Sequence, residues 1–87
     1  MLLTELITTR LAALQPIDLE IQDDSASHAG HKGNTGGGHF RLKIVSSQFS
    51  QKSQIIRHRL IYQALTDLIP QQIHALSILA ISPDDPS

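Results

Sequence analysis

Apolar side chains at the start of the chain recur at the spacing of a helix. They fall three or four positions apart, which places them on one buried face, and they are Leu3, Ile7, Leu11 and Leu14. Pro16 disfavours helical geometry at the residue before it. The pattern therefore predicts a first helix over about 2–14.

Two later stretches alternate apolar and polar residues. In the first, directly after Pro16, the apolar positions are Ile17, Leu19 and Ile21 and the polar positions are Asp18, Glu20 and Gln22. In the second, the apolar positions are Phe40, Leu42 and Ile44 and the polar positions are Arg41 and Lys43. A period of two predicts strands with one buried face. The acids of the first strand would oppose the bases of the second in an antiparallel pair.

Residues 23–38, between these two strands, contain all five glycines together with His28, His31 and Lys32. The stretch has no hydrophobic residue larger than alanine, so it cannot pack a core, and we predict a mobile loop. Loops of this length in a compact domain are usually either functional or disordered.

After Ser47 the period becomes helical again. The apolar stripe, which Pro70 closes, consists of Ile56, Leu60, Ala64, Leu65 and Leu68. Ser50 and Ser53 are both candidate N-caps. Arg57 projects near the middle of the stripe, which argues against one uniform helix over 53–69. We expect a short helix or turn that leads into a longer helix.

The last apolar stretch, Ile73 to Ile81, is interrupted by His74 and Ser77. It is typical of a strand that is buried on both faces or covered by helices. A helix before it permits a parallel crossover. We therefore predict one α+β domain over 1–87, with the order helix-strand-strand-helix-helix-strand around a small three-stranded mixed sheet, and a frayed tail at 82–87.

Composition narrows the classes of protein. The chain is 40% hydrophobic and 17% charged, without an apolar run of 18 residues, so we expect a soluble protein and no membrane contact. A chain of 87 residues is too short for a large interior cavity. No cysteine is present, so the thiolates of any iron-sulfur or zinc site must come from a partner. Residues 1–10 do not resemble a secretory signal, and we expect a cytoplasmic location.

Charge is segregated along the sequence. No acid lies between Asp24 and Asp67, and this stretch holds six of the seven bases: Lys32, Arg41, Lys43, Lys52, Arg57 and Arg59. One interpretation is a positive surface for a nucleic acid or an acidic partner. The other, slightly favoured by charge alone, is a set of scattered charges that are screened within about 10 Å at 0.1 M salt.

Histidine is the other notable feature, with five residues. Neutral imidazole is a ligand for iron, copper and zinc, although the loop residues His28 and His31 would more commonly be solvated. His74 opens an apolar strand and needs a hydrogen-bond partner or an exposed edge. His58 is interpreted as a packing anchor and His39 as a strand-end residue. No catalytic triad, phosphate loop or carboxylate pair is recognisable, so we expect no enzyme and no small-molecule substrate.

Several short motifs together resemble the BolA family. They cover nearly the whole chain: His39-Phe40-Arg41, Val45-Ser46, Phe49, Lys52-Ser53, Arg57-His58-Arg59-Leu60, Ile73-His74-Ala75-Leu76 and Ser82-Pro83. The resemblance implies a fold related to the type II KH domain, in agreement with the order of elements predicted above. Gln51 departs from the pattern, because many members of the family have glycine at this place.

The resemblance also implies a partner and a cofactor. BolA-like proteins bind monothiol glutaredoxins and share with them a [2Fe-2S] cluster, held on one side by glutaredoxin cysteine and glutathione. Carried over by position, the ligands of this chain would be His28 and His74, with His31 as the substitute in the loop. Imidazoles that replace two thiolates are a known cluster pattern, and they raise the reduction potential.

Some members of the family are described as transcriptional regulators, so DNA is the alternative partner. Lys52, Arg57 and Arg59 would then contact phosphates, and binding would fall steeply with salt. The chain lacks a Gly-x-x-Gly loop and has only two Phe and one Tyr to stack on bases, which argues against this alternative.

Overall fold

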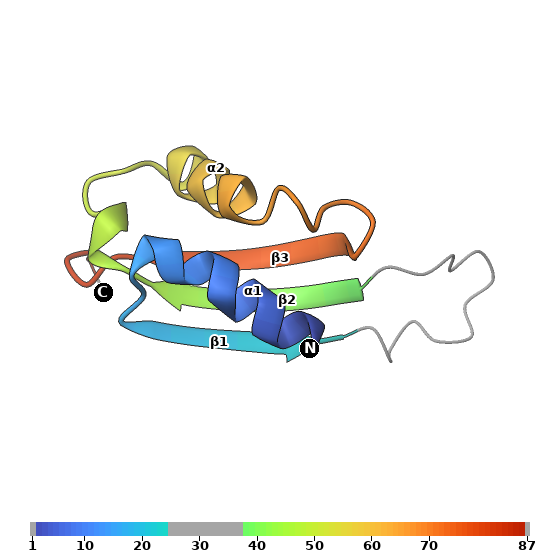
Figure 1. Cartoon of the computed structure of the whole chain (residues 1–87). Coiled ribbons are helices and arrows are strands. Elements are labelled where there is room, and N and C mark those ends of the chain that lie inside the picture. The colour runs from blue at the N-terminus through green and yellow to red at the C-terminus, as the bar shows by residue number, and fades with distance from the viewer. Residues whose placement is uncertain (1, 25–37, 87) are drawn as a thin grey trace.

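The computed structural model describes residues 2–24 and 38–86, so His28, His31 and Lys32 lie outside the described residues. Within these residues the chain forms two α-helices and a three-stranded sheet (Figure 1), which confirms the predicted α+β class. The elements are α1 (Leu3–Leu11), the 3-10 turn η1 (Ala12–Leu14), β1 (Asp18–Asp23), β2 (Gly38–Val45), the 3-10 turn η3 (Ser47–Phe49), α2 (Gln54–Ala64) and β3 (Ile73–Ile81).

The sheet is mixed, with strand order β1-β2-β3. β1 runs antiparallel to β2, and β2 runs parallel to β3 across the crossover that contains α2. In the register of the antiparallel pair, Glu20 lies opposite Lys43, and their charged atoms are 3.3 Å apart. The predicted facing of acids and bases across these two strands is confirmed there.

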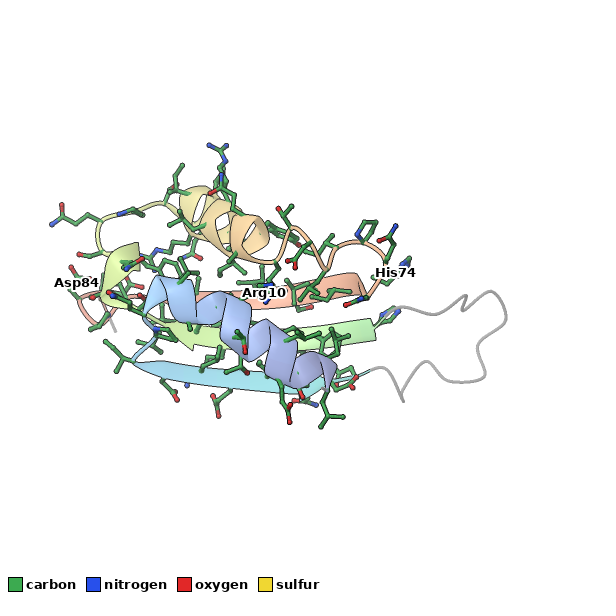
Figure 2. The ribbon with its side chains drawn as sticks, in the orientation of Figure 1. Arg10, His74 and Asp84 are labelled. Carbon is green, nitrogen blue, oxygen red and sulfur yellow. The ribbon has the colours of Figure 1, made fainter. Side chains whose placement is uncertain are left out.

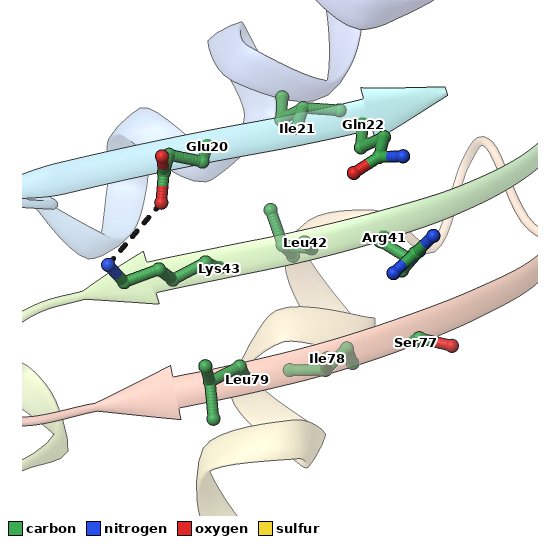
Figure 3. Close-up of a pocket in the computed structure, with 9 residues that line it drawn as sticks. All are labelled: Glu20, Ile21, Gln22, Arg41, Leu42, Lys43, Ser77, Ile78 and Leu79. Atoms are coloured by element: carbon green, nitrogen blue, oxygen red, sulfur yellow. Dashed lines mark ion pairs between the residues drawn. The ribbon is translucent and has the colours of Figure 1, made fainter. Parts of the chain in front are cut away.

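Both helices cover the same face of the sheet and leave the other face open (Figures 1 and 3). The core between sheet and helices consists of Ile7, Leu11, Leu14, Phe40, Leu42, Ile44, Phe49, Ile61, Leu65, Leu68, Ile73 and Ala80. On the open face, Leu79 of β3 is 55% exposed. β3 is therefore covered by helices on one side only, because no second layer packs on its other side in the described part of the chain.

The first predicted helix is confirmed as α1 followed by η1. It stops because Gln15 takes a left-handed conformation, with φ of 50°, directly before Pro16. Leu14 is buried at the end of η1, and its carbonyl accepts a hydrogen bond of 2.6 Å from the Ser46 hydroxyl. This contact ties the end of the first helix to the residue that follows β2.

The region between β2 and β3 confirms the prediction of a short helix or turn that leads into a longer helix. The 3-10 turn η3 comes first, and α2 begins after Ser53, whose hydroxyl accepts a hydrogen bond from the Ile56 N–H at 3.2 Å. α2 ends at Ala64, and buried Leu65 and Leu68 lie in turns that precede Pro70. The predicted stripe therefore faces the core, with Leu65 and Leu68 buried and the other three residues half-buried, but its last residues are not helical.

The predicted frayed tail is wrong for Ser82–Asp85, here called the C-terminal turn. Ser82 is buried, and its N–H donates to the Asp85 carboxylate at 2.9 Å. The Asp85 N–H donates back to the Ser82 carbonyl at 3.0 Å. Polar contacts hold this turn, which a search for apolar periodicity does not detect.

Candidate metal-binding end of the sheet

His39 and His74 lie side by side at one end of the sheet. Each is the second residue of its strand, and β2 and β3 are parallel neighbours, so the topology brings both to the same end. Their ring centroids are 5.5 Å apart, with the planes tilted by 43°. Sequence reasoning treated His39 only as a strand-end residue. The predicted parallel crossover was the signal that could have paired it with His74.

Asp24 and Gly38, the described residues on either side of 25–37, lie beside these two histidines. The Asp24 N–H donates to the His39 carbonyl at 2.7 Å, and the Gly38 N–H donates to the Gln72 carbonyl at 2.8 Å, one residue before β3. We call this region, defined by Asp24, Gly38, His39 and His74, the histidine end. Figure 2 shows His74 there, at the opposite end of the sheet from Asp84.

The spacing of the two rings fits joint binding of a metal ion. Two imidazole nitrogens about 2.1 Å from one tetrahedral ion place the ring centroids about 5 Å apart, close to the observed 5.5 Å. His74 is exposed, so a ligand from another molecule can approach it. Among the described residues no group of three or more ligating side chains is found. The pair would therefore need further ligands from outside the described chain.

Ion pairs neutralise part of the predicted basic surface. Arg41 Nε lies 2.6 Å from the Asp24 carboxylate, and Lys43 lies between Asp18 and Glu20 at 3.9 and 3.3 Å. Of the residues predicted to contact nucleic acid, only Lys52 and Arg59 are exposed.

Arg57 does not belong to an exposed basic surface, because it is only 4% exposed. Its two terminal nitrogens donate to the Asp85 carboxylate at 2.6 and 2.7 Å, and its Nε donates to the Lys52 carbonyl at 2.9 Å. One terminal nitrogen also donates to the Ala80 carbonyl at 3.1 Å. These acceptors engage the guanidinium on all sides, so it is not available to a phosphate.

The same contacts set the protonation of Asp85. Hydrogen bonds from Arg57, and then from the Ser82 N–H, lower the pKa of Asp85 from 3.8 to about 2. The Asp85 hydrogen bonds raise the pKa of Arg57 above its ordinary value. The sequence held a clue to this pair, since a base in the middle of an apolar stripe requires a buried partner.

The open face of the sheet contains a shallow pocket of about 490 Å³, shown in Figure 3. Its polar lining residues are Glu20, Gln22, Arg41, Lys43 and Ser77. Lys43 pairs with Glu20 inside the pocket, and Arg41 pairs with Asp24 beside it. Because both cations of the pocket already form ion pairs with carboxylates of the chain, neither is an unpaired charge that would bind a ligand.

Comparison with known proteins decides the family. A family model described as "BolA-like protein" matches residues 11–85. The chain belongs to the BolA family. Among curated BolA relatives, the chloroplastic protein BOLA1 of Arabidopsis thaliana is 41% identical over 76 residues, which cover 83% of this chain and 48% of that protein. The SufE-like protein 1 of the same plant is 47% identical over 76 residues, or 80% of this chain and 20% of that protein.

The chain thus spans only about half and a fifth of the length of these two relatives. It covers the whole of a solved BolA fold, however. BolA1 from Arabidopsis thaliana superimposes with a TM-score of 0.83 at 35% identity, over 99% of this chain and 98% of that one. The BolA domain of SufE1 gives 0.77 at 48% identity, over 91% and 90%. No helix in the described ranges is long and apolar enough to cross a membrane.

Proposed function

We propose that this BolA-like chain is a binding partner of a monothiol glutaredoxin and shares a [2Fe-2S] cluster with it through His74. The observation that carries the proposal is the His39–His74 pair, with ring centroids 5.5 Å apart, beside the described residues Asp24 and Gly38. By family resemblance the second ligand is His28, with His31 as its substitute. His39 is the described alternative for that second position.

The chemistry suits a chain without cysteine. Glutaredoxin cysteine and glutathione supply thiolates to one iron, and two imidazoles of this chain supply the other. Imidazole ligation on one iron raises the reduction potential relative to an all-thiolate cluster. The proposed role is iron-sulfur trafficking or redox and iron sensing. It is a binding role rather than a catalytic one, and we propose the cytoplasm as its location.

Anaerobic reconstitution tests this function. The chain is mixed with a monothiol glutaredoxin, glutathione, iron and sulfide, and the products are followed by visible circular dichroism and native mass spectrometry. We expect a heterodimer whose spectrum differs from that of the glutaredoxin homodimer and changes on His74→Ala. His58→Ala is the matched control, since His58 lies half-buried on α2 and should leave the spectrum unchanged. Absence of a heterodimer with the wild-type chain would refute the proposal.

DNA binding is the second candidate, favoured by the exposure of Lys52 and Arg59. Arg57 weakens it, because its guanidinium is buried against Asp85. Two phosphate contacts would give only a shallow fall of affinity with salt, with a logarithmic slope of about −2. Titration of a labelled DNA duplex at moderate salt decides the matter, and no binding by the free chain would remove this candidate.

A further inference from the structure

β3 forms one edge of the sheet, because the strand order is β1-β2-β3 (Figure 1). An edge strand presents backbone groups to solvent, and charged side chains or proline usually keep a second chain from pairing with them. The nine residues of β3 include no Asp, Glu, Lys, Arg or Pro. β1, at the other edge, contains the acids Asp18, Glu20 and Asp23. Only the β1 edge is therefore protected by charge.

Hydrogen bonds at the end of β3 show which of its backbone groups point away from β2. The Ile81 carbonyl accepts a hydrogen bond of 2.9 Å from the residue that follows β2. The Ala80 carbonyl instead accepts one of 3.1 Å from the Arg57 guanidinium. Because backbone groups of successive strand residues point to alternate edges, those of Leu76 and Ile78 point outward like those of Ala80. In the described part of the chain, no backbone hydrogen bond outside the β2–β3 ladder involves Leu76 or Ile78.

The unpaired part of this edge is the segment Ala75–Leu79, which we call the free edge. Beyond it, Arg57 and Gln54 cover the Ala80 carbonyl, at 3.1 and 3.4 Å. Within it, the side chains of Ala75, Ser77 and Leu79 are exposed and lie on the open face of the sheet, where Figure 3 shows the latter two. The free edge thus combines unpaired backbone groups with an uncharged, exposed row of side chains.

We propose that the free edge pairs antiparallel with the free edge of a second copy of this chain, which joins the two sheets into one continuous sheet. Leu76 would lie opposite Ile78 of the second copy, and Ile78 opposite its Leu76. Each of these pairs would exchange both N–H···O bonds between the strands. The inference does not rest on the proposed function, because it involves neither the cluster nor glutaredoxin.

This register suits two identical strands. It places Ser77 opposite Ser77 of the second copy, and serine hydroxyls in such a cross-strand pair can hydrogen-bond. It also places exposed Leu79 opposite Ala75, whose small side chain leaves room for the leucine. The two-fold axis would be perpendicular to the sheet, so the helices of both copies would cover the same face. The acids of β1 would then lie at both outer edges and stop further growth of the sheet.

Other occupants match the free edge less well. A phosphate group finds no cation there, because β3 has neither lysine nor arginine. An extended segment of another protein could pair with the same backbone groups, but nothing in the described chain selects its side chains. A second copy brings its own Ala75 to Leu79 and its own Ser77 to Ser77, so the free edge is complementary to itself.

The first test is sedimentation equilibrium of the chain alone, in the presence of a chelator. Concentrations should span about 10 µM to about 1 mM, since interfaces of this small size are weak. We expect the mass to rise from that of one chain, 9.6 kDa, toward twice that value. The chelator excludes a dimer bridged by metal between the histidine ends.

Charge exchange at Ser77 tests the register. Ser77→Asp and Ser77→Lys each place like charges opposite one another across the two-fold axis, and each should weaken dimerisation about tenfold or more. An equimolar mixture of the two variants should restore the dimer, because Asp then faces Lys. Ser47→Asp and Ser47→Lys are the matched controls, since Ser47 is also an exposed serine but lies in η3, beyond the end of β2. Circular dichroism checks that each variant is folded.

Hydrogen exchange gives a readout of the backbone pairing itself. The Leu76 and Ile78 amides should exchange more slowly as the concentration of the wild-type chain rises, because they become hydrogen-bonded to the second copy. In Ser77→Asp alone this protection should be lost, and in the mixture with Ser77→Lys it should return.

Three outcomes would overturn the proposal. The first is a wild-type chain that stays monomeric at the highest concentration. The second is a dimer that the two Ser77 variants form as readily as the wild type, because that dimer would use another surface. The third is protection of the Leu76 and Ile78 amides only after glutaredoxin is added, which would assign the edge to a different occupant. Cluster reconstitution tests the proposed function separately, so either proposal can fail alone.

Discussion

The two ends of the sheet are built differently. At one end, which we call the latched end, side-chain hydrogen bonds join Arg57 of α2 to Asp85 of the C-terminal turn, and the Ser46 hydroxyl donates to the Leu14 carbonyl of η1. The described contacts of the histidine end are mainly backbone hydrogen bonds and the Arg41–Asp24 ion pair. Figure 2 shows Asp84 and His74 at these opposite ends.

From this difference we infer that one end of the sheet stabilises the fold and the other end binds a partner. The side-chain contacts of the latched end join segments that are distant in sequence, so substitutions there should lower the stability of the fold. The histidine end presents two imidazole rings, one of them exposed, beside Asp24 and Gly38. Substituting these rings should change binding and leave the fold almost intact. The predictions below test this contrast in order of decreasing effect.

The largest effect is expected at Phe49 in η3, beside the latched end. Phe49 is fully buried, so Phe49→Ala leaves a cavity and should lower the free energy of unfolding by about 3–5 kcal/mol. His74→Ala removes an exposed ring and should cost about 0.5 kcal/mol or less. Urea unfolding of both variants measures the two values. Similar losses would contradict the division between the ends.

Gly38 is the position where the histidine end should tolerate least change. A Cβ at this residue would overlap the ring of Phe40, which is buried and cannot move freely. We expect Gly38→Ala to lower the free energy of unfolding by about 1–3 kcal/mol and to shift the NMR resonances of the neighbouring His39. Unchanged stability and unchanged His39 resonances would show that the Phe40 ring is not held as described.

The latched end should also respond to acid. Since the pKa of Asp85 is lowered from 3.8 to about 2, its contribution to stability is complete above 3.8 and is lost as pH falls through about 2. Asp85→Asn should lower the melting temperature by several degrees at pH 6 and make the acid dependence shallower. The pKa values of Asp67 and Asp84 are also lowered, so some dependence should remain.

Thermal unfolding from pH 2 to pH 7 measures this effect, and Asp67→Asn is the comparison. Asp67 pairs with Arg10 at an exposed site, with 2.8 Å between the charged atoms. Its replacement should lower the melting temperature less than Asp85→Asn does, because exposed ion pairs contribute little. An equal decrease in the melting temperature of both variants would mean that the Arg57–Asp85 pair contributes no more than an exposed ion pair.

The smallest effect is a gain in stability at Gln51. This residue has a left-handed backbone, with φ of 59°, at the place where many family members have glycine. Glycine adopts this conformation without steric cost, so Gln51→Gly should raise the free energy of unfolding by about 0.5–1 kcal/mol. Gln51→Val, which is β-branched, should lower it. A destabilising Gln51→Gly would mean that the Gln51 side chain makes a contact worth more than the strain.

Much of this architecture could be predicted from residue periodicity. The spacing of Leu3, Ile7 and Leu11 predicted α1, and the apolar run Ile73–Ile81 coincides with β3. The C-terminal turn could not be predicted in this way, because Ser82 and Asp85 are held by polar contacts between segments far apart in sequence. The same holds for the His39–His74 pair, which depends on the parallel register of two strands.

The most direct test of the central claim is the number of histidine nitrogens bound to the cluster. The chain is labelled with ¹⁵N-histidine, assembled with unlabelled glutaredoxin and reduced, and examined by pulsed electron paramagnetic resonance. The account predicts couplings from two histidine nitrogens in the wild type. One of these couplings should disappear in His74→Ala, and both should persist in His58→Ala. A cluster that shows no ¹⁵N coupling from this chain would contradict it.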